Sequence, residues 1–262
     1  MSFFIISLTA LVVSGLTMFS GFGLGTLLMP VFALFFPVEV AVASTSVVHG
    51  ANNIFKMLLL GKDAEWSMVI RFGIPAIATA FLGAAALSYI SDLNEITRYT
   101  IGSKIAVITP LKLIMGMLMI FFSLFELLPS LKSIRFRKKH LIWGGLLSGF
   151  FGGLSGHQGA LRSAFLVKTG ISTKAFVATN AVIGFLVDIT RIASYFFFFL
   201  LVKAHSPIGP DQWPLVAVGT LAAFTGVLIG KRFIQKIKIS VIRTLTGIML
   251  FMIALALGSG II

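Results

Sequence analysis

Residues 141–168 read LIWGGLLSGFFGGLSGHQGALRSAFLVK, an apolar stretch interrupted in its middle by glycine and polar residues. A bilayer core about 30 Å thick needs only about 20 helical residues, so this stretch is too long for one straight crossing. Residues 3–36 have the same character: as one helix they would reach roughly 50 Å, and glycines at 21, 23 and 25 and then Pro30 interrupt them. Glycines that merely allow close helix packing would explain either cluster alone. Because two clusters occur, we expect two helical hairpins that each enter and leave the membrane on one side.

The composition around these two stretches is that of a membrane protein. Of 262 residues, 58% are hydrophobic and only 11% are charged, whereas about a quarter are charged in soluble domains. Six further apolar segments are each long enough to cross a bilayer, namely 39–60, 68–90, 103–127, 174–202, 212–231 and 242–262. The predicted fold class is therefore an all-α membrane protein with several transmembrane helices.

The positive charges decide how many segments cross. The loops 128–140 and 231–243 each carry five Lys or Arg residues, and both should be cytoplasmic because basic loops stay on that side. If all eight apolar units crossed once, these two loops would lie on opposite sides. If 141–168 is a hairpin, both fall inside. Treating 3–36 in the same way places the two termini and the 91–104 loop outside, with most of the 21 Lys and Arg residues in the cytoplasm.

The two hairpins divide the chain into two similar halves. An offset of 134 residues aligns Gly25 with Gly159 and Thr45 with Thr179. We expect a first repeat at 1–128 (hairpin 3–36, helices 39–60, 68–90 and 103–127) and a basic cytoplasmic linker at 129–140. The second repeat would be 141–262 (hairpin 141–168, helices 174–202, 212–231 and 242–262). Three crossings per half invert the second half, an architecture that recurs in secondary transporters with a midplane site between broken helices.

Arg162 is the most informative single residue, because it should lie near the midplane, where an unpaired cation costs several kcal/mol. It is either an anion contact or a structural cap on carbonyl groups of the other hairpin. The second arms of the hairpins begin near Leu24 and His157, and the positive ends of these helices suit an anion.

Polar residues on two helices complete the predicted site. In 39–60 the residues Thr45, His49, Asn52 and Lys56 share one helical face, which either lines a cavity or forms hydrogen bonds between helices; Lys56 could also extend to the cytoplasmic interface. The predicted substrate-binding set is Gly23, Leu24, Gly25, Ser44, Thr45, His49, Asn52, Gly156, His157, Gln158, Gly159, Arg162, Thr179 and Asn180. His49, Lys56, Asp188 and Arg191 are candidates for gating or proton relay, although Asp188 and Arg191, three residues apart, are also expected to form a local ion pair.

Two segments carry a family resemblance. They are SGFGLGTLLMPVFALFFPVEVAVASTS at 20–46 and GFFGGLSGHQGALRSAFLVKTGISTKAFVATNA at 149–181. In each, a glycine-rich segment precedes a Pro37 or Gly170 turn and an A-x-x-x-[ST] helix. The chain resembles the TauE/SafE family of sulfite exporters over nearly its full length. The resemblance implies export of small sulfur oxyanions or sulfonates across the bacterial cytoplasmic membrane. The Gly-Leu-Ser-Gly-His-Gln-Gly segment and Arg162 depart from the family's plain glycine triplet and leave the substrate open.

The sequence therefore predicts a secondary transporter of a small sulfur-containing anion that works by alternating access in the inner membrane. The alternatives are a passive anion channel, a transporter of another small organic anion, and a non-transporting membrane partner. No nucleotide-binding loop, catalytic triad or metal-ligand cluster is recognisable, so neither enzyme activity nor a cofactor or metal is expected. The expected partners are the anion and anionic lipid headgroups at the basic loops. A homodimer stays open, and nucleic acid is not expected.

Overall fold

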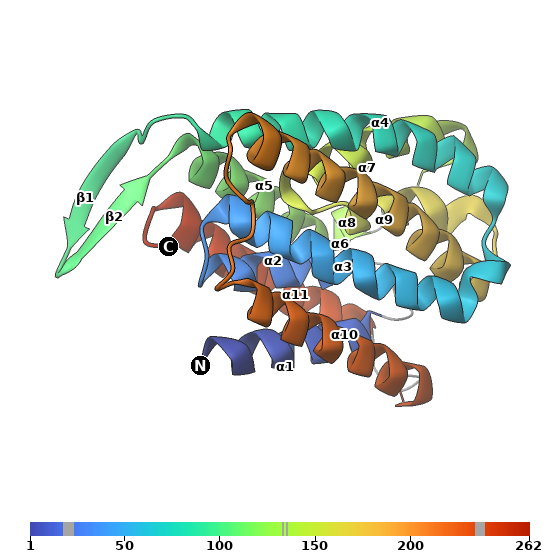
Figure 1. The fold of residues 1–262 in the computed structure, drawn as a ribbon. Helices are drawn as coiled ribbons and strands as arrows, with labels where there is room; N and C mark the ends of the chain where they lie inside the picture. The colour runs from blue at the N-terminus through green and yellow to red at the C-terminus, as the bar shows by residue number, and fades with distance from the viewer. Residues whose placement is uncertain (18–23, 133, 135, 234–238) are drawn as a thin grey trace.

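The computed structural model describes residues 1–17, 24–132, 134, 136–233 and 239–262, which form a helical bundle with one small β-hairpin (Figure 1). In chain order the helices are α1 (Ser2–Leu16), α2 (Leu24–Ala33), α3 (Val38–Leu60), α4 (Trp66–Ser91), α5 (Pro110–Leu127), α6 (Pro129–Lys132), α7 (Leu141–Ser155), α8 (Gly159–Leu166), α9 (Thr173–Tyr195), α10 (Trp213–Phe233) and α11 (Ile239–Gly258). Short 3₁₀ turns occupy Gly61–Asp63, Lys138–His140 and Val167–Thr169, and a π-helical segment, η4 (Phe196–Val202), continues α9.

Several helices have the length and composition of membrane spans. Within the described residues, α4, α5, α9 together with η4, and α10 are long and apolar enough to cross a bilayer. Large apolar side chains also point outward, among them Leu58, Ile74 and Leu201 at 79%, 62% and 72% exposure. An outer surface formed by large apolar side chains suits lipid as the surrounding solvent.

The segment after α4 differs from the expected helix at 103–127. Strand β1 (Thr97–Ile101) pairs antiparallel with β2 (Lys104–Ile108), with Thr97 opposite Ile108. Alternating Thr, Tyr, Ile and Val residues favour strands, and the hairpin turn contains Gly102 at φ +59°. Helix α5 begins only at Pro110, where proline suits the first helical position and the Thr109 hydroxyl accepts a hydrogen bond from Lys112 N at 3.1 Å. Hydrophobicity alone therefore did not distinguish strand β2 from the start of the helix that follows it.

Helices α7 and α8 form a helical hairpin in the 141–168 stretch. Gly156, at φ +79°, ends α7 in the left-handed conformation that glycine adopts easily. Phe136, which precedes α7, donates a backbone hydrogen bond to Ala164 O near the end of α8 (3.2 Å), and its ring stacks on that of Phe165. The chain therefore returns to the end at which it started. Helices α1 and α2 also pack against each other, but residues 18–23, including the predicted glycine break at 21 and 23, lie outside the described part of the chain.

Glycine residues lie at the contacts of the four major helix pairs. Helix α7 runs parallel to α4: a Cβ added at Gly145, Gly149 or Gly153 would lie 2.2, 2.1 or 2.0 Å from a backbone oxygen of α4. Helix α1 runs parallel to α10, where a Cβ added at Gly226 or Gly230 would lie 2.2 Å from Leu11 O or 2.6 Å from Gly15 O. By contrast, α3 packs antiparallel to α9, and α5 antiparallel to α11. Glycines thus let the backbones approach, as is usual in membrane bundles.

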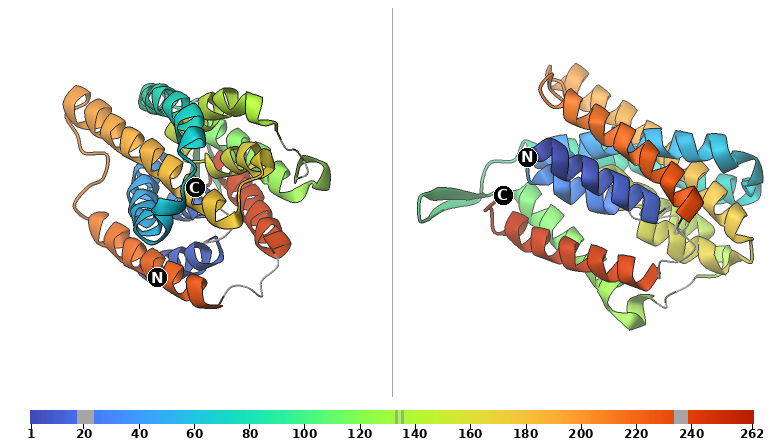
Figure 2. Two further views of the ribbon diagram at one scale, coloured as in Figure 1. Left: turned by 90° about the vertical axis from the view of Figure 1, so that its right-hand side faces the viewer. Right: turned by 90° about the horizontal axis from the view of Figure 1, so that it is seen from below.

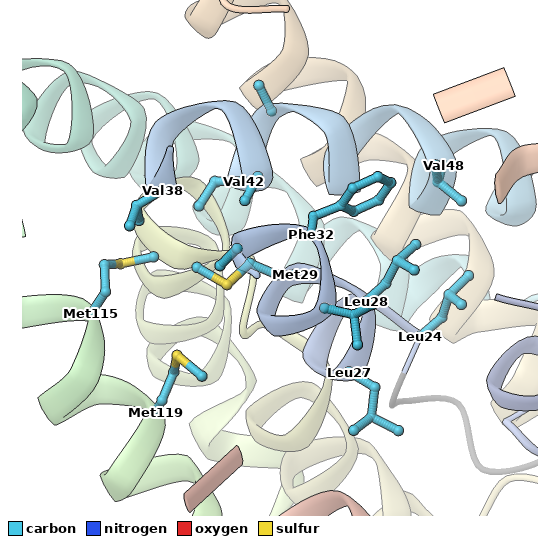
Figure 3. Close-up of a cluster of buried hydrophobic side chains, with 14 of the residues drawn as sticks. Leu24, Leu27, Leu28, Met29, Phe32, Val38, Val42, Val48, Met115 and Met119 are labelled. Carbon is cyan, nitrogen blue, oxygen red and sulfur yellow. The ribbon is translucent and has the colours of Figure 1, made fainter. Parts of the chain in front are cut away.

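Helix α2 lies in the middle of the apolar core. All ten of its residues are buried. Leu24, Leu28, Met29 and Phe32 pack among side chains of α3 and α5, including Met115 (Figure 3). A ten-residue helix is too short to span a bilayer core, so this burial by neighbouring helices is what allows it to end inside the protein.

The two ends of the bundle differ. The N-terminus, the C-terminus and the β-hairpin lie at one end (Figures 1 and 2), where Val107 N donates to Gly260 O at 3.0 Å. At the other end Lys174 pairs with Asp63 at 3.0 Å, joining the start of α9 to the α3–α4 connection. Because α10 runs parallel to α1, its basic end at Lys231 and Arg232 is also at this second end.

Candidate functional site

Asp188 of α9 is the centre of a buried polar cluster between the two halves. Its Oδ2 lies 2.6 Å from His49 Nδ1 and 2.8 Å from Asn53 Nδ2, both on α3. Its Oδ1 accepts from Gln158 Nε2 and Arg191 Nε, each at 3.0 Å, and lies 2.8 Å from Arg191 Nη2. The ion pair that the spacing of Asp188 and Arg191 predicts is present, and the same carboxylate also joins α3 and the tip of the α7–α8 hairpin.

Arg162 lies beside this carboxylate network, on α8. Its Nε donates to Asn180 Oδ1 at 2.8 Å and its Nη1 to Gln158 Oε1 at 3.0 Å. Gln158 therefore bridges Arg162 and Asp188. Arg162 is only 1% exposed, so its guanidinium group is held within the protein interior, among the residues that the sequence placed at the site.

Lys56 adds a third cation one turn from Asn53 along the buried face of α3. Its side chain is 7% exposed, and so it does not extend into solvent at the interface. Within the described residues the cluster contains the cations of Arg162, Arg191 and Lys56 against the single carboxylate of Asp188. The site thus carries an excess of positive charge where burial makes charge expensive.

The first turn of α2 and the tip of the α7–α8 hairpin meet at this cluster. A Cβ added at Gly25, in the first turn of α2, would lie 3.4 Å from Gly156 O and 3.4 Å from the His49 ring. On the other side of the tip, a Cβ at Gly156 would lie 3.0 Å from Arg191 Nη1. Glycine at both positions lets α2, the second tip and the His49–Asp188 pair approach one another. Gly159 begins α8 directly after this tip.

Other predicted residues have different surroundings. Thr179 accepts a hydrogen bond from Glu65 N at 2.9 Å and so helps to position the start of α4. The ring of His157 stacks on Phe122 of α5 with centroids 5.3 Å apart, and its Nδ1 lies 3.1 Å from Ser155 Oγ. Thr45 bonds to its own helix at Ala41 O, and Leu24 packs in the apolar core.

Asn52, Ser44 and Gly23 complete the predicted set. Asn52 accepts a hydrogen bond from Ser14 Oγ of α1 at 2.8 Å. Ser44 is fully buried on α3, and among the described residues its hydroxyl has no hydrogen-bond partner. Gly23 lies outside the residues that the structure describes.

Three residues of the site were missed by the sequence analysis. Asn53 binds Asp188, Ser14 binds Asn52, and the Tyr195 hydroxyl donates to Gly153 O. Asn53 could have been found because it follows His49 by four residues on the same helical face. Ser14 and Tyr195 carry no such signal, since their roles depend on which helix lies opposite.

The cluster is closed to solvent in this conformation. Exposure is 7% for His49, 1% for Arg162 and 0% for Asp188 and Arg191. A cation-rich site closed among apolar helices, several of which are long enough to cross a bilayer, indicates a multi-pass integral membrane protein.

The comparison with protein families agrees with this class. The model described as sulfite exporter TauE/SafE matches residues 5–257. The chain therefore belongs to the sulfite exporter TauE/SafE family of membrane transporters. Comparisons with curated proteins and with solved structures gave no match.

Proposed function

We propose that this protein is a secondary transporter that exports a small sulfur-containing anion, sulfite or a related sulfonate or oxyanion, across the bacterial cytoplasmic membrane. The observation that carries the proposal is the excess of buried cations around Asp188, because a neutralising anion would remove the cost of leaving positive charge in the interior. Family membership supports sulfur anions as the substrate class. Arg162 and Lys56 are the proposed anion contacts.

The closed cluster favours alternating access over a permanently open channel. The site is formed by α3, α9, the first turn of α2 and the α7–α8 tip, so small movements of these elements would expose it to one side at a time. In such transporters the substrate binds near the midplane, where discontinuous helices meet. The proposed substrate path therefore passes between Gly25 and Gly156.

We also propose that the two halves are inverted repeats. If α1 to α5 correspond in order to α7 to α11, then the packed pair α1–α10 corresponds to the packed pair α7–α4, and both pairs run parallel. The packed pairs α3–α9 and α5–α11 each consist of two corresponding helices. A self-matched pair must run antiparallel if the repeats are inverted, which is the direction that both pairs have. The α3–α4 connection and the basic end of α10 would then be cytoplasmic, and the termini would lie on the other side.

Cysteine labelling tests this orientation without background, because the chain contains no cysteine. We expect Ser2→Cys, Glu95→Cys and Ile262→Cys to react in intact spheroplasts with a reagent that does not cross membranes. Arg137→Cys should react only after permeabilisation. Labelling of Ile262→Cys from the cytoplasmic side alone would contradict the proposed orientation.

Flux into proteoliposomes tests the function. We expect saturable uptake of labelled sulfite, thiosulfate or sulfoacetate and little uptake of acetate, because the family model that the chain matches is one of sulfite exporters. Empty liposomes provide the control. If none of these anions is transported, the proposed function is wrong, and if flux rises without saturation, the protein is a channel.

A further inference from the structure

His157, at the tip of the α7–α8 hairpin, is a buried histidine with one ring nitrogen in use and one without a partner. The residue is 1% exposed, and its ring stacks on that of Phe122 with centroids 5.3 Å apart. Its Nδ1 lies 3.1 Å from Ser155 Oγ, whereas its Nε2 is buried and has no hydrogen-bond partner among the described residues. Buried polar atoms are usually paired, so this unpaired nitrogen requires an explanation.

The hydrogen bonds of Ser155 determine which nitrogen of His157 carries the hydrogen. The Ser155 hydroxyl donates its single hydrogen to Phe151 O at 3.0 Å. In its contact with His157 the Ser155 oxygen is therefore the acceptor, and Nδ1 carries the N–H group. A neutral imidazole has one donor nitrogen and one acceptor nitrogen. Nε2 is thus a lone pair within the protein interior, and it is the atom that binds a proton.

The closed conformation does not accommodate the imidazolium form of His157. A proton on Nε2 would create a second N–H donor and a positive charge, and no described residue offers an acceptor there. The guanidinium group of Arg191 lies beside the tip, because a Cβ added at Gly156 would lie 3.0 Å from Arg191 Nη1. An unpaired charge is costly to bury, and a like charge nearby adds to that cost.

The two buried carboxylates around the tip contact other groups. Asp188 already binds four side chains through its two oxygens. Glu126, one turn along α5 from Phe122, lies at the contact with α11, where a Cβ added at Gly247 would lie 3.2 Å from Glu126 Cβ. The charged and titratable residues on the helices around the tip are His49 and Lys56 of α3, Arg71 of α4, Glu126 of α5, Arg162 of α8, and Asp188, Arg191 and Tyr195 of α9.

We infer that His157 is a proton switch of the transporter: its neutral form permits the closed conformation, and its protonated form holds the α7–α8 tip out of that conformation. This inference rests on the proposed function, because alternating access passes through a closed conformation in every cycle. Gln158, the next residue, binds both Asp188 and Arg162, so movement of the tip also opens the polar cluster. Acidic pH would therefore slow transport by reducing the fraction of protein that closes.

The test measures methanesulfonate uptake into proteoliposomes containing the full chain, with equal pH on both sides. Methanesulfonate keeps a single negative charge throughout, so a pH effect belongs to the protein. The neutral fraction of an imidazole in water falls from about 90% near pH 7.5 to about 10% near pH 5.5. We expect wild-type uptake to fall about tenfold over this range.

The His157→Asn variant keeps an N–H group beside Ser155 and removes the titrating nitrogen. Its uptake should change less than about twofold between the two pH values. His205→Asn, at an exposed histidine outside the polar cluster, is the matched control and should keep the wild-type pH profile. A tenfold fall that persists in His157→Asn would overturn the inference and leave the proposed function standing.

A second measurement does not depend on transport. Ser163, in the first turns of α8, is 4% exposed, so the reaction of Ser163→Cys with a maleimide reports opening of the hairpin. Its rate in detergent is divided by that of the exposed Glu95→Cys at the same pH, which corrects for thiol ionisation. The ratio should rise about tenfold from pH 7.5 to pH 5.5 and stay constant when His157→Asn is added.

The two measurements separate failure of the switch from failure of the transporter. A reaction ratio that does not change with pH in the protein with His157 intact means that the inference is wrong. If the wild type transports neither methanesulfonate nor sulfite at either pH, the proposed function has failed, and the cysteine reaction still decides whether His157 controls the tip. If His157→Asn is folded but inactive at both pH values, the same reaction decides.

Discussion

Replacing Arg162 by alanine is expected to reduce the saturable anion flux about a hundredfold. Removing one partner of a buried, charge-assisted contact costs about 2–5 kcal/mol, and each 1.4 kcal/mol corresponds to a factor of ten in binding. The change also removes the hydrogen bonds to Asn180 and Gln158. Gln158 would then no longer bridge Arg162 and Asp188. Initial rates of labelled sulfite uptake at substrate concentrations below saturation measure the effect.

Two further variants distinguish substrate contact from folding. Arg162→Lys keeps the charge but loses the two-pronged geometry of the guanidinium, so we expect intermediate flux. Arg71→Ala removes an exposed arginine from α4 and should leave flux unchanged. Wild-type flux in Arg162→Ala would show that this residue caps structure instead of binding the anion, which is the alternative that the sequence left open.

Replacing Gly153 by alanine is expected to destabilise the protein by about 3 kcal/mol or more, the upper end of usual overpacking costs. The added Cβ would lie 2.0 Å from Ala80 O, a backbone atom that cannot move away without shifting α4. Because α7 also carries the hairpin tip and Gly152 O, which accepts from Arg191 Nη1 at 3.4 Å, the site should be distorted as well. Thermal unfolding in detergent and the yield of monodisperse protein measure the effect.

The matched control is Gly258→Ala at the end of α11, where an added Cβ meets no atom within 4 Å. Alanine forms helix better than glycine by up to about 1 kcal/mol, so this variant should be as stable as the wild type or slightly more so. Equal stability of both variants would mean that α4 and α7 do not pack as closely as the structure has them.

The features that the sequence predicted well are those that depend on local composition. The helical stretches, the break at Gly156 and the basic segments follow from hydrophobicity, glycine content and charge along the chain. The β-hairpin was missed because β2, KIAVI at 104–108, is as apolar as a helix start, and only Gly102 and Pro110 marked the boundaries. The surroundings of Thr179 and His157 were also not predictable, since they depend on α4 and α5.

By itself, the sequence determined that this is a helical membrane protein of the sulfite exporter family with buried cations and broken helices. Each of these properties depends on residues that are close together in the chain. Only the tertiary structure decided which polar groups meet. His49 and Asp188 are 139 residues apart and form a 2.6 Å contact because α3 and α9 pack antiparallel. That packing depends on the shapes of two helix faces and on glycines such as Gly184, which no local pattern encodes. It leaves Asp188 shared among four partners, which lie on α3, on α9 and at the tip of the α7–α8 hairpin.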